Sequence, residues 1–137
     1  MTLSTYKEEF QKLPGEITEA FSEAWGALVE VLTEEELVTW ADNGLSIAQR
    51  PGRSWEAAIE YFKASPFMVQ HLPFIHLKQW GYWGNEIAEE SPIVSRIYFK
   101  TSPQIAKSLK PWDVAEWAQL GKKLYGKGNR SGVLSIR

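Results

Sequence analysis

The side chains of this 137-residue chain that could perform chemistry are few, and their spacing fits no catalytic or metal site. The only histidines are His71 and His76, which on one helix would point about 140° apart, and Pro73 lies between them. A helical zinc site places two histidines four residues apart and needs a third ligand. We therefore interpret both histidines as partly exposed or capping side chains.

The acidic runs Glu34-Glu35-Glu36 and Glu89-Glu90 each lie near an expected helix end. The first run falls at a helix start, where the helix dipole favours negative charge. Catalytic carboxylates instead converge from different elements, in environments that separate their pKa values. Nothing in the sequence indicates such a pair, so we interpret these runs as solvated helix ends.

Two glycine-lysine segments, Gly121-Lys122-Lys123 and residues 126–129, lack the spacing of a phosphate loop and the strand that precedes one. The second segment is typical of a helix C-terminus followed by a turn. The chain contains no cysteine, which excludes disulfides and thiolate sites. The sequence therefore predicts a protein that is not an enzyme and that uses no cofactor or metal.

A sequence motif that contains tryptophan recurs along the chain at intervals of 40 and 37 residues. Its recurrence indicates the architecture of the protein. An internal repeat of this length is typical of stacked helical arrays. In each copy the apolar residues and the glycine share one helical face. The three copies are Leu37-x-x-Trp40-x-x-x-Gly44-x-x-Ile47, Leu77-x-x-Trp80-x-x-x-Gly84-x-x-Ile87 and Val114-x-x-Trp117-x-x-x-Gly121-x-x-Leu124.

A second motif has the sequence Tyr-Phe-Lys-Ala/Thr-Ser-Pro and occurs at 61–66 and 98–103. Each copy precedes the next tryptophan of the first motif by the same number of residues. Serine is a good N-cap and proline suits the first turn of a helix, so Ser65-Pro66 predicts a short helix over residues 67–72. A longer helix over 74–90 would follow and carry the tryptophan. A third would open at Ser54 or at Ser91-Pro92.

These elements predict an all-α fold, an armadillo/HEAT-like right-handed α–α superhelix of about three units in one domain, 1–137. The units are expected at about 16–60, 61–97 and 98–137. Three helices per unit are closer to an armadillo repeat than to a two-helix repeat. Ser131 holds the same repeat position as Ser54, where the third helix of a unit is expected to begin. The chain would then end inside a unit, so we expect it to be part of a longer repeat protein.

The first unit is expected to be atypical, as terminal repeats often are. Its first helix is predicted to run unbroken over 16–32. Thr33-x-x-Glu36 is a capping-box pattern that would open the next helix. An amphipathic lead-in helix around residues 6–10 would stop at Pro14-Gly15.

The tryptophans divide into core candidates and surface candidates. Trp40, Trp80 and Trp117 share one repeat position with apolar neighbours, so we expect them between helices. The glycine beside each one would open space for a neighbouring helix or an indole ring. The aromatic residues off that position are candidates for a protein-binding surface, namely Tyr82, Trp83 and Trp112.

Charge is distributed unevenly, although the net charge is −2. Residues 1–42 carry a charge of −8 and residues 96–137 carry +7. This gradient could steer a partner or favour head-to-tail association between copies, or it could reflect solvated faces only. Nucleic-acid backbone binding is the alternative function. It would use the basic residues Lys107, Lys110, Lys122, Lys123, Lys127 and Arg130, together with Lys100.

No apolar run is long enough to cross a membrane and no leader peptide opens the chain, so we expect a cytoplasmic protein. The function that the sequence favours is a scaffold for protein–protein interaction.

The phrase Tyr61-Phe62-Lys63-Ala64-Ser65-Pro66, followed by Trp80 and Gly84, resembles the helical repeat region of bacterial von Willebrand factor A domain proteins of the nitric-oxide-reductase-activating type. The resemblance covers residues 21–137. It implies a scaffold in complex assembly, with an AAA-type ATPase as a partner. The metal-binding Asp-x-Ser-x-Ser of that A domain is missing from this chain. The resemblance therefore implies no metal site here.

Overall fold

The computed structural model describes residues 2–52, 54–110, 113–114, 116–117 and 119–120, and these residues form helices without any strand. The all-α prediction is therefore confirmed for the described chain. Its six named helices are α1 (Leu3–Phe10), α2 (Gly15–Leu28), α3 (Glu34–Ala48), α4 (Ser54–His71), α5 (Phe74–Glu90) and α6 (Pro92–Ser108).

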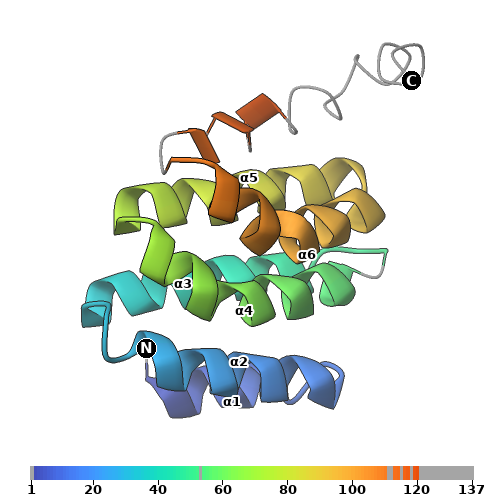
Figure 1. Cartoon of the computed structure of the whole chain (residues 1–137). Coiled ribbons are helices and arrows are strands. Elements are labelled where there is room, and N and C mark those ends of the chain that lie inside the picture. Colours follow the sequence, from blue (N-terminus) through green and yellow to red (C-terminus); the bar gives the residue numbers. More distant parts are fainter. Residues whose placement is uncertain (1, 53, 111–112, 115, 118, 121–137) are drawn as a thin grey trace.

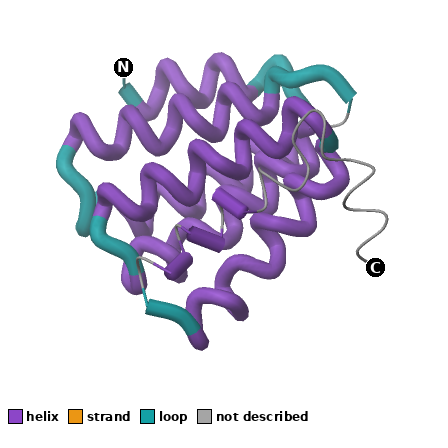
Figure 2. The backbone as a smooth tube through the Cα atoms, turned by 90° about the horizontal axis from the view of Figure 1, so that it is seen from above, coloured by secondary structure: helices purple, strands orange, loops and turns teal. Residues whose placement is uncertain are grey.

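The helices are arranged in two layers that follow the chain from one end of the molecule to the other (Figure 1). One layer has α4 in the middle, packed against α2 on one side and α6 on the other. In the second layer α3 packs against α5, and each also packs against the helix that follows it. The short helix α1 lies against α2 at the N-terminal end (Figures 1 and 2).

Local capping signals place several helix starts where the sequence predicts them. The Thr33 hydroxyl accepts a hydrogen bond from the Glu36 amide at 3.1 Å, and the Glu36 carboxylate accepts one from the Thr33 amide at 2.9 Å. This reciprocal pair is the expected capping box of α3. The Ser91 hydroxyl caps α6 by accepting a hydrogen bond from the Val94 amide at 3.2 Å, without the reciprocal bond of a capping box. Helix α5 spans the expected residues 74–90.

The predicted unbroken helix over 16–32 is wrong at its C-terminal end. Helix α2 ends at Leu28, and residues 30 and 31 form a turn before α3 begins. The lead-in helix is confirmed as α1, which buries Tyr6 and Phe10 completely. The Pro14-Gly15 pair marks the start of α2 as well as the end of the lead-in segment.

The predicted short helix over 67–72 is also wrong, because Pro66 lies inside the continuous helix α4 and Pro103 lies inside α6. The serine before each proline does not cap a helix. The Ser65 hydroxyl donates to the carbonyl of Tyr61, one turn earlier, at 2.6 Å. Each tryptophan helix is therefore followed by one long helix rather than two, which contradicts the three-helix unit.

These serines are instead fixed by tertiary hydrogen bonds to the tryptophans. The Trp40 indole Nε1 donates to Ser65 Oγ at 2.9 Å, and the Trp80 indole Nε1 donates to Ser102 Oγ at 2.8 Å. In both places the tyrosine four residues before the serine donates to the carbonyl of the same tryptophan at 2.8 Å. The identical hydrogen-bond set thus joins α3 to α4 and α5 to α6, and it satisfies every polar group involved.

The recurring glycine provides the space for these helices to meet. A Cβ atom on Gly44 would overlap the Phe62 ring of α4, and one on Gly84 would overlap the Phe99 ring of α6. The expected space for a neighbouring helix is confirmed, but the ring that fills it is phenyl rather than indole. The close approach offsets the cost of glycine within a helix, about 1 kcal/mol relative to alanine.

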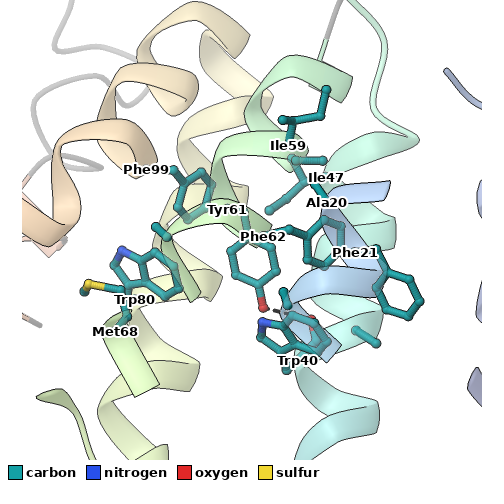
Figure 3. Packing of buried hydrophobic residues seen from close by; sticks show 14 of the residues in the cluster. Ala20, Phe21, Trp40, Ile47, Ile59, Tyr61, Phe62, Met68, Trp80 and Phe99 are labelled. Atoms are coloured by element: carbon teal, nitrogen blue, oxygen red, sulfur yellow. Dashed lines mark hydrogen bonds between the residues drawn. The ribbon is translucent and has the colours of Figure 1, made fainter. Parts of the chain in front are cut away.

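An unbroken series of aromatic contacts runs through the core (Figure 3). Tyr61 stacks on Trp40 with ring centroids 6.2 Å apart and on Trp80 at 5.3 Å, so one phenol joins two tryptophan helices. The expected burial of Trp40 and Trp80 is confirmed. Trp117 is half-buried and stacks on Tyr98 at 4.8 Å, which extends the series toward the C-terminus.

Two of the buried phenols, Tyr61 and Tyr98, make stability sensitive to alkaline pH. Burial raises the pKa of Tyr61 and of Tyr98 well above the ordinary value of 10.0. Their contribution to stability is complete below about pH 10 and is lost as pH rises toward the raised folded-state pKa, because only the unfolded phenols ionise there. We expect urea unfolding between pH 8 and 11 to show this loss. In the Tyr98→Phe variant the free energy of unfolding should be lower at pH 8 and should fall less steeply above pH 10.

Candidate functional site

The exposed aromatic pair on α5 is the first part of the candidate site. Tyr82 is 49% exposed, as expected for a binding residue, whereas Trp83 is half-buried and packs against the core. The two rings contact each other edge to face at a centroid distance of 5.0 Å. The third candidate, Trp112, lies outside the described residues.

Tyr82 also lines a groove between α3 and α5 with a volume of about 300 Å³. The groove arises because the two tryptophan helices lie side by side, with Tyr61 of α4 beneath them. Aromatic and aliphatic side chains form most of its wall, as in most ligand-binding pockets. The lining residues are Thr39, Trp40, Asp42, Asn43, Tyr61, Phe74, Leu77, Lys78 and Tyr82.

Gly81 brings α5 close to α3 beside this groove. A Cβ atom there would lie 2.8 Å from Asn43 Nδ2 and 3.0 Å from Tyr61 Cε1. Tyr61 is itself fixed, because its hydroxyl donates to the Trp40 carbonyl. The groove is therefore built from side chains that core packing already holds in place, which reduces the entropy lost when a ligand binds.

Two charged side chains line the groove, and they come from opposite helices: Asp42 on α3 and Lys78 on α5. The Tyr6 hydroxyl donates to Asp42 Oδ1 at 2.6 Å, which ties this carboxylate to α1. Burial raises the pKa of Tyr6, and the hydrogen bond to Asp42 and its negative charge raise it further. Tyr6 therefore stays a neutral hydrogen-bond donor that positions Asp42.

A clasp of polar side chains joins the C-terminal half of α3 to α5. The Arg50 Nε donates to Asn85 Oδ1 at 2.6 Å, and its guanidinium lies 3.8 Å from carboxylate oxygens of Glu86 and of Glu89. The Asn85 amide in turn donates to Ser46 Oγ at 3.1 Å. This clasp holds the groove-forming helices together.

The histidines are not brought into a metal site. His71 is exposed and stacks on Phe67 at 4.2 Å, while His76 Nδ1 lies 3.2 Å from Gln79 Oε1. Among the described residues, no group of three or more histidine, cysteine or acidic side chains could hold a metal ion. No helix in the described part of the chain is long and apolar enough to span a membrane.

The basic residues predicted to form a patch are only partly described. Lys107 and Lys110 are exposed, and the Lys107 ammonium lies 5.7 Å from the centroid of the Phe67 ring. This cation–π contact connects α6 to α4. Lys100 is also exposed. The other four candidates lie outside the described residues, namely Lys122, Lys123, Lys127 and Arg130.

Sequence reasoning found Tyr82 but missed most of the groove. Thr39, Asn43 and Phe74 belong to no motif, and their grouping depends on α3 lying beside α5. One signal could have found them. Because the tryptophan helices recur, residues just before or after each tryptophan should face the seam between neighbouring helices.

Comparison of the chain with known protein families, with curated proteins and with solved structures found no match. The geometry of the groove is therefore the basis for assigning a function.

Proposed function

We propose that this chain is a non-enzymatic helical-repeat scaffold that binds a partner protein through the groove between α3 and α5. The observation that carries the proposal is the exposed Tyr82 ring on a preformed, mainly apolar groove. Tyrosine is enriched among the residues that dominate binding energy at protein interfaces.

The size and lining of the groove support a peptide side chain as its occupant. A volume of about 300 Å³ is at the lower end of ligand pockets and suits one large apolar side chain with its neighbouring backbone. The charged atoms of Asp42 and Lys78 are available to the polar groups that flank such a side chain. The partner would present an apolar anchor within a polar segment.

The finer architecture is part of the same proposal, namely an armadillo/HEAT-like right-handed superhelix with units at about 16–60, 61–97 and 98–137. Its support is the hydrogen-bond set that occurs at both Trp40 and Trp80. The resemblance to von Willebrand factor A domain proteins extends the proposal to complex assembly, with an AAA-type ATPase as the partner.

Replacing Tyr82 by alanine is expected to weaken partner binding at least about tenfold, because the variant loses the exposed aromatic surface of the groove. Affinity purification from a lysate of the source cells, with quantitative mass spectrometry, measures this loss. A captured ATPase would identify the partner class.

The matched control is Ile75→Ala, on the same helix. Ile75 is 64% exposed and does not line the groove, so this variant should retain every partner. Recovery of the same proteins by Tyr82→Ala and by the parent chain would exclude the groove as the binding site.

A further inference from the structure

The outer surface of the layer formed by α2, α4 and α6 carries a graded charge that the groove does not explain. The three helices align in sequence when Phe21, Tyr61 and Tyr98 are taken as equivalent positions. Two residues further along, the equivalent positions hold Glu23 in α2, Lys63 in α4 and Lys100 in α6. All three of these charged side chains are exposed. Because the three helices pack side by side in this order, the three charges lie along one face.

The α2 end of this face is acidic. Glu16, Glu19 and Glu23 are exposed and follow one another at i, i+3 and i+7, which places them on a single stripe of the helix. The buried residues of α2, among them Ile17 and Phe21, lie on another side of the helix. The acidic stripe therefore points away from the core.

The α6 end of the face is basic and apolar. Lys100 and Lys107 are exposed seven residues apart, on the same stripe as Ile93 and Ile97, which are 70% and 49% exposed. At the corresponding positions α4 carries Glu56 and Glu60. An exposed isoleucine pair where the neighbouring helix has acids is an apolar surface without an internal role.

Two contacts show that α4 and α6 form a continuous surface here. Arg96 Nε lies 3.6 Å from Glu56 Oε2, and the Lys107 ammonium lies over the Phe67 ring. The face therefore changes from acidic at α2, through mixed charge at α4, to basic at α6.

We propose that this face binds a second copy of the chain as a two-fold symmetric dimer. A rotation of 180° about an axis along α4 places the acidic α2 of each copy opposite the basic α6 of the other. The acidic α2 and basic α6 then attract each other at both edges of the interface, while Lys63 of α4 meets its own copy at the centre. The attraction at the two edges must outweigh this central repulsion for a closed two-fold dimer to form. The exposed Ile93 and Ile97 of each α6 are then covered by the other copy.

The size of the face is sufficient for such a dimer. Three helices about 25 Å long and about 10 Å wide present roughly 750 Å². Stable interfaces bury about 800 Å² on each partner. The charge gradient alone also suggested head-to-tail association, but the acidic and basic stripes lie on one face, which favours the two-fold arrangement.

Sedimentation velocity of the purified chain tests the proposal. The parent chain should form a dimer at low salt and dissociate at high salt, because exposed charge pairs are screened. Lys100→Glu with Lys107→Glu makes both ends of the face acidic, and Glu19→Lys with Glu23→Lys makes both ends basic. Each double variant should bind itself at least about tenfold more weakly than the parent chain does.

An equal mixture of the two double variants should restore a dimer, because each acidic end then meets a basic one. The variant with all four substitutions should dimerise by itself for the same reason. Restored assembly also shows that the variants are folded. The control Lys12→Glu makes the net charge more negative in the turn between α1 and α2, outside the three helices of the face, and should remain dimeric.

Three results would overturn the proposal. The first is a parent chain that stays monomeric at low salt. The second is a mixture of the two double variants that remains monomeric. The third is a mixture that forms long polymers instead of dimers, which would show head-to-tail association. The Tyr82→Ala variant should dimerise normally, so failure of the groove proposal and failure of the dimer proposal are separate results.

Discussion

Replacing Trp80 by alanine is expected to lower the free energy of unfolding by about 3–5 kcal/mol. The indole is fully buried, and it contacts Tyr61 of α4 and Phe99 of α6, so its removal opens a cavity where three helices meet. It also leaves the Ser102 hydroxyl without its indole donor. Because small domains are stable by only about 5–15 kcal/mol, this loss is a large fraction of the total. Urea denaturation followed by circular dichroism measures it.

The matched control is Trp83→Ala, three residues along the same helix. Trp83 is half-buried and packs at the margin of the core, so its replacement should cost about 1–2 kcal/mol. Equal losses at the two positions would contradict the assignment of Trp80 as the residue that joins three helices.

The second large effect is expected at Gly84, where alanine should destabilise the fold by about 2 kcal/mol or more. A new Cβ would overlap the Phe99 ring, so α5 and α6 must separate or the ring must leave its position. Alanine favours the helix by about 1 kcal/mol over glycine, and this gain is too small to offset the overlap. The melting temperature and the free energy of unfolding in urea both report the change.

Gly26→Ala in α2 should have the opposite sign. No atom lies within 4 Å of a Cβ built on Gly26, so the variant should gain roughly 0.5–1 kcal/mol from helix propensity alone. A second check is Phe99→Leu, whose smaller side chain should recover part of the stability lost in Gly84→Ala. Stabilisation by Gly84→Ala itself would show that the close helix contact is wrong.

Helix positions were largely predictable from the sequence because the signals that set them are local. The Thr33–Glu36 capping box and the Ser91 cap act within four residues, so the residues alone indicate them. The apolar spacing around Trp40 and Trp80 fixed the buried faces of α3 and α5 for the same reason.

The Ser-Pro pairs were misread because their meaning depends on distant residues. By local chemistry Ser65-Pro66 opens a helix, yet the Ser65 hydroxyl accepts from an indole 25 residues earlier and the helix continues through the proline. A residue with two possible hydrogen-bond roles takes the one that the tertiary structure satisfies.

The candidate site likewise contains one residue that local sequence indicates and several that depend on the packing of distant helices. Tyr82 could be named from the sequence because it falls off the recurring buried position. Asn43, Phe74 and the other lining residues could not be named, since they meet only when α3 lies beside α5.

The sequence by itself determined the starts of α3, α5 and α6 and the buried faces around the recurring tryptophan and glycine, because capping and periodicity act over a few residues. Only the tertiary structure decided that Phe62 and Phe99 fill the space at the glycines, that the serines bind the indoles, and that α3 and α5 enclose a groove. Those outcomes depend on which surfaces of distant helices pack together, and close packing between helices is not encoded in the spacing of any single segment.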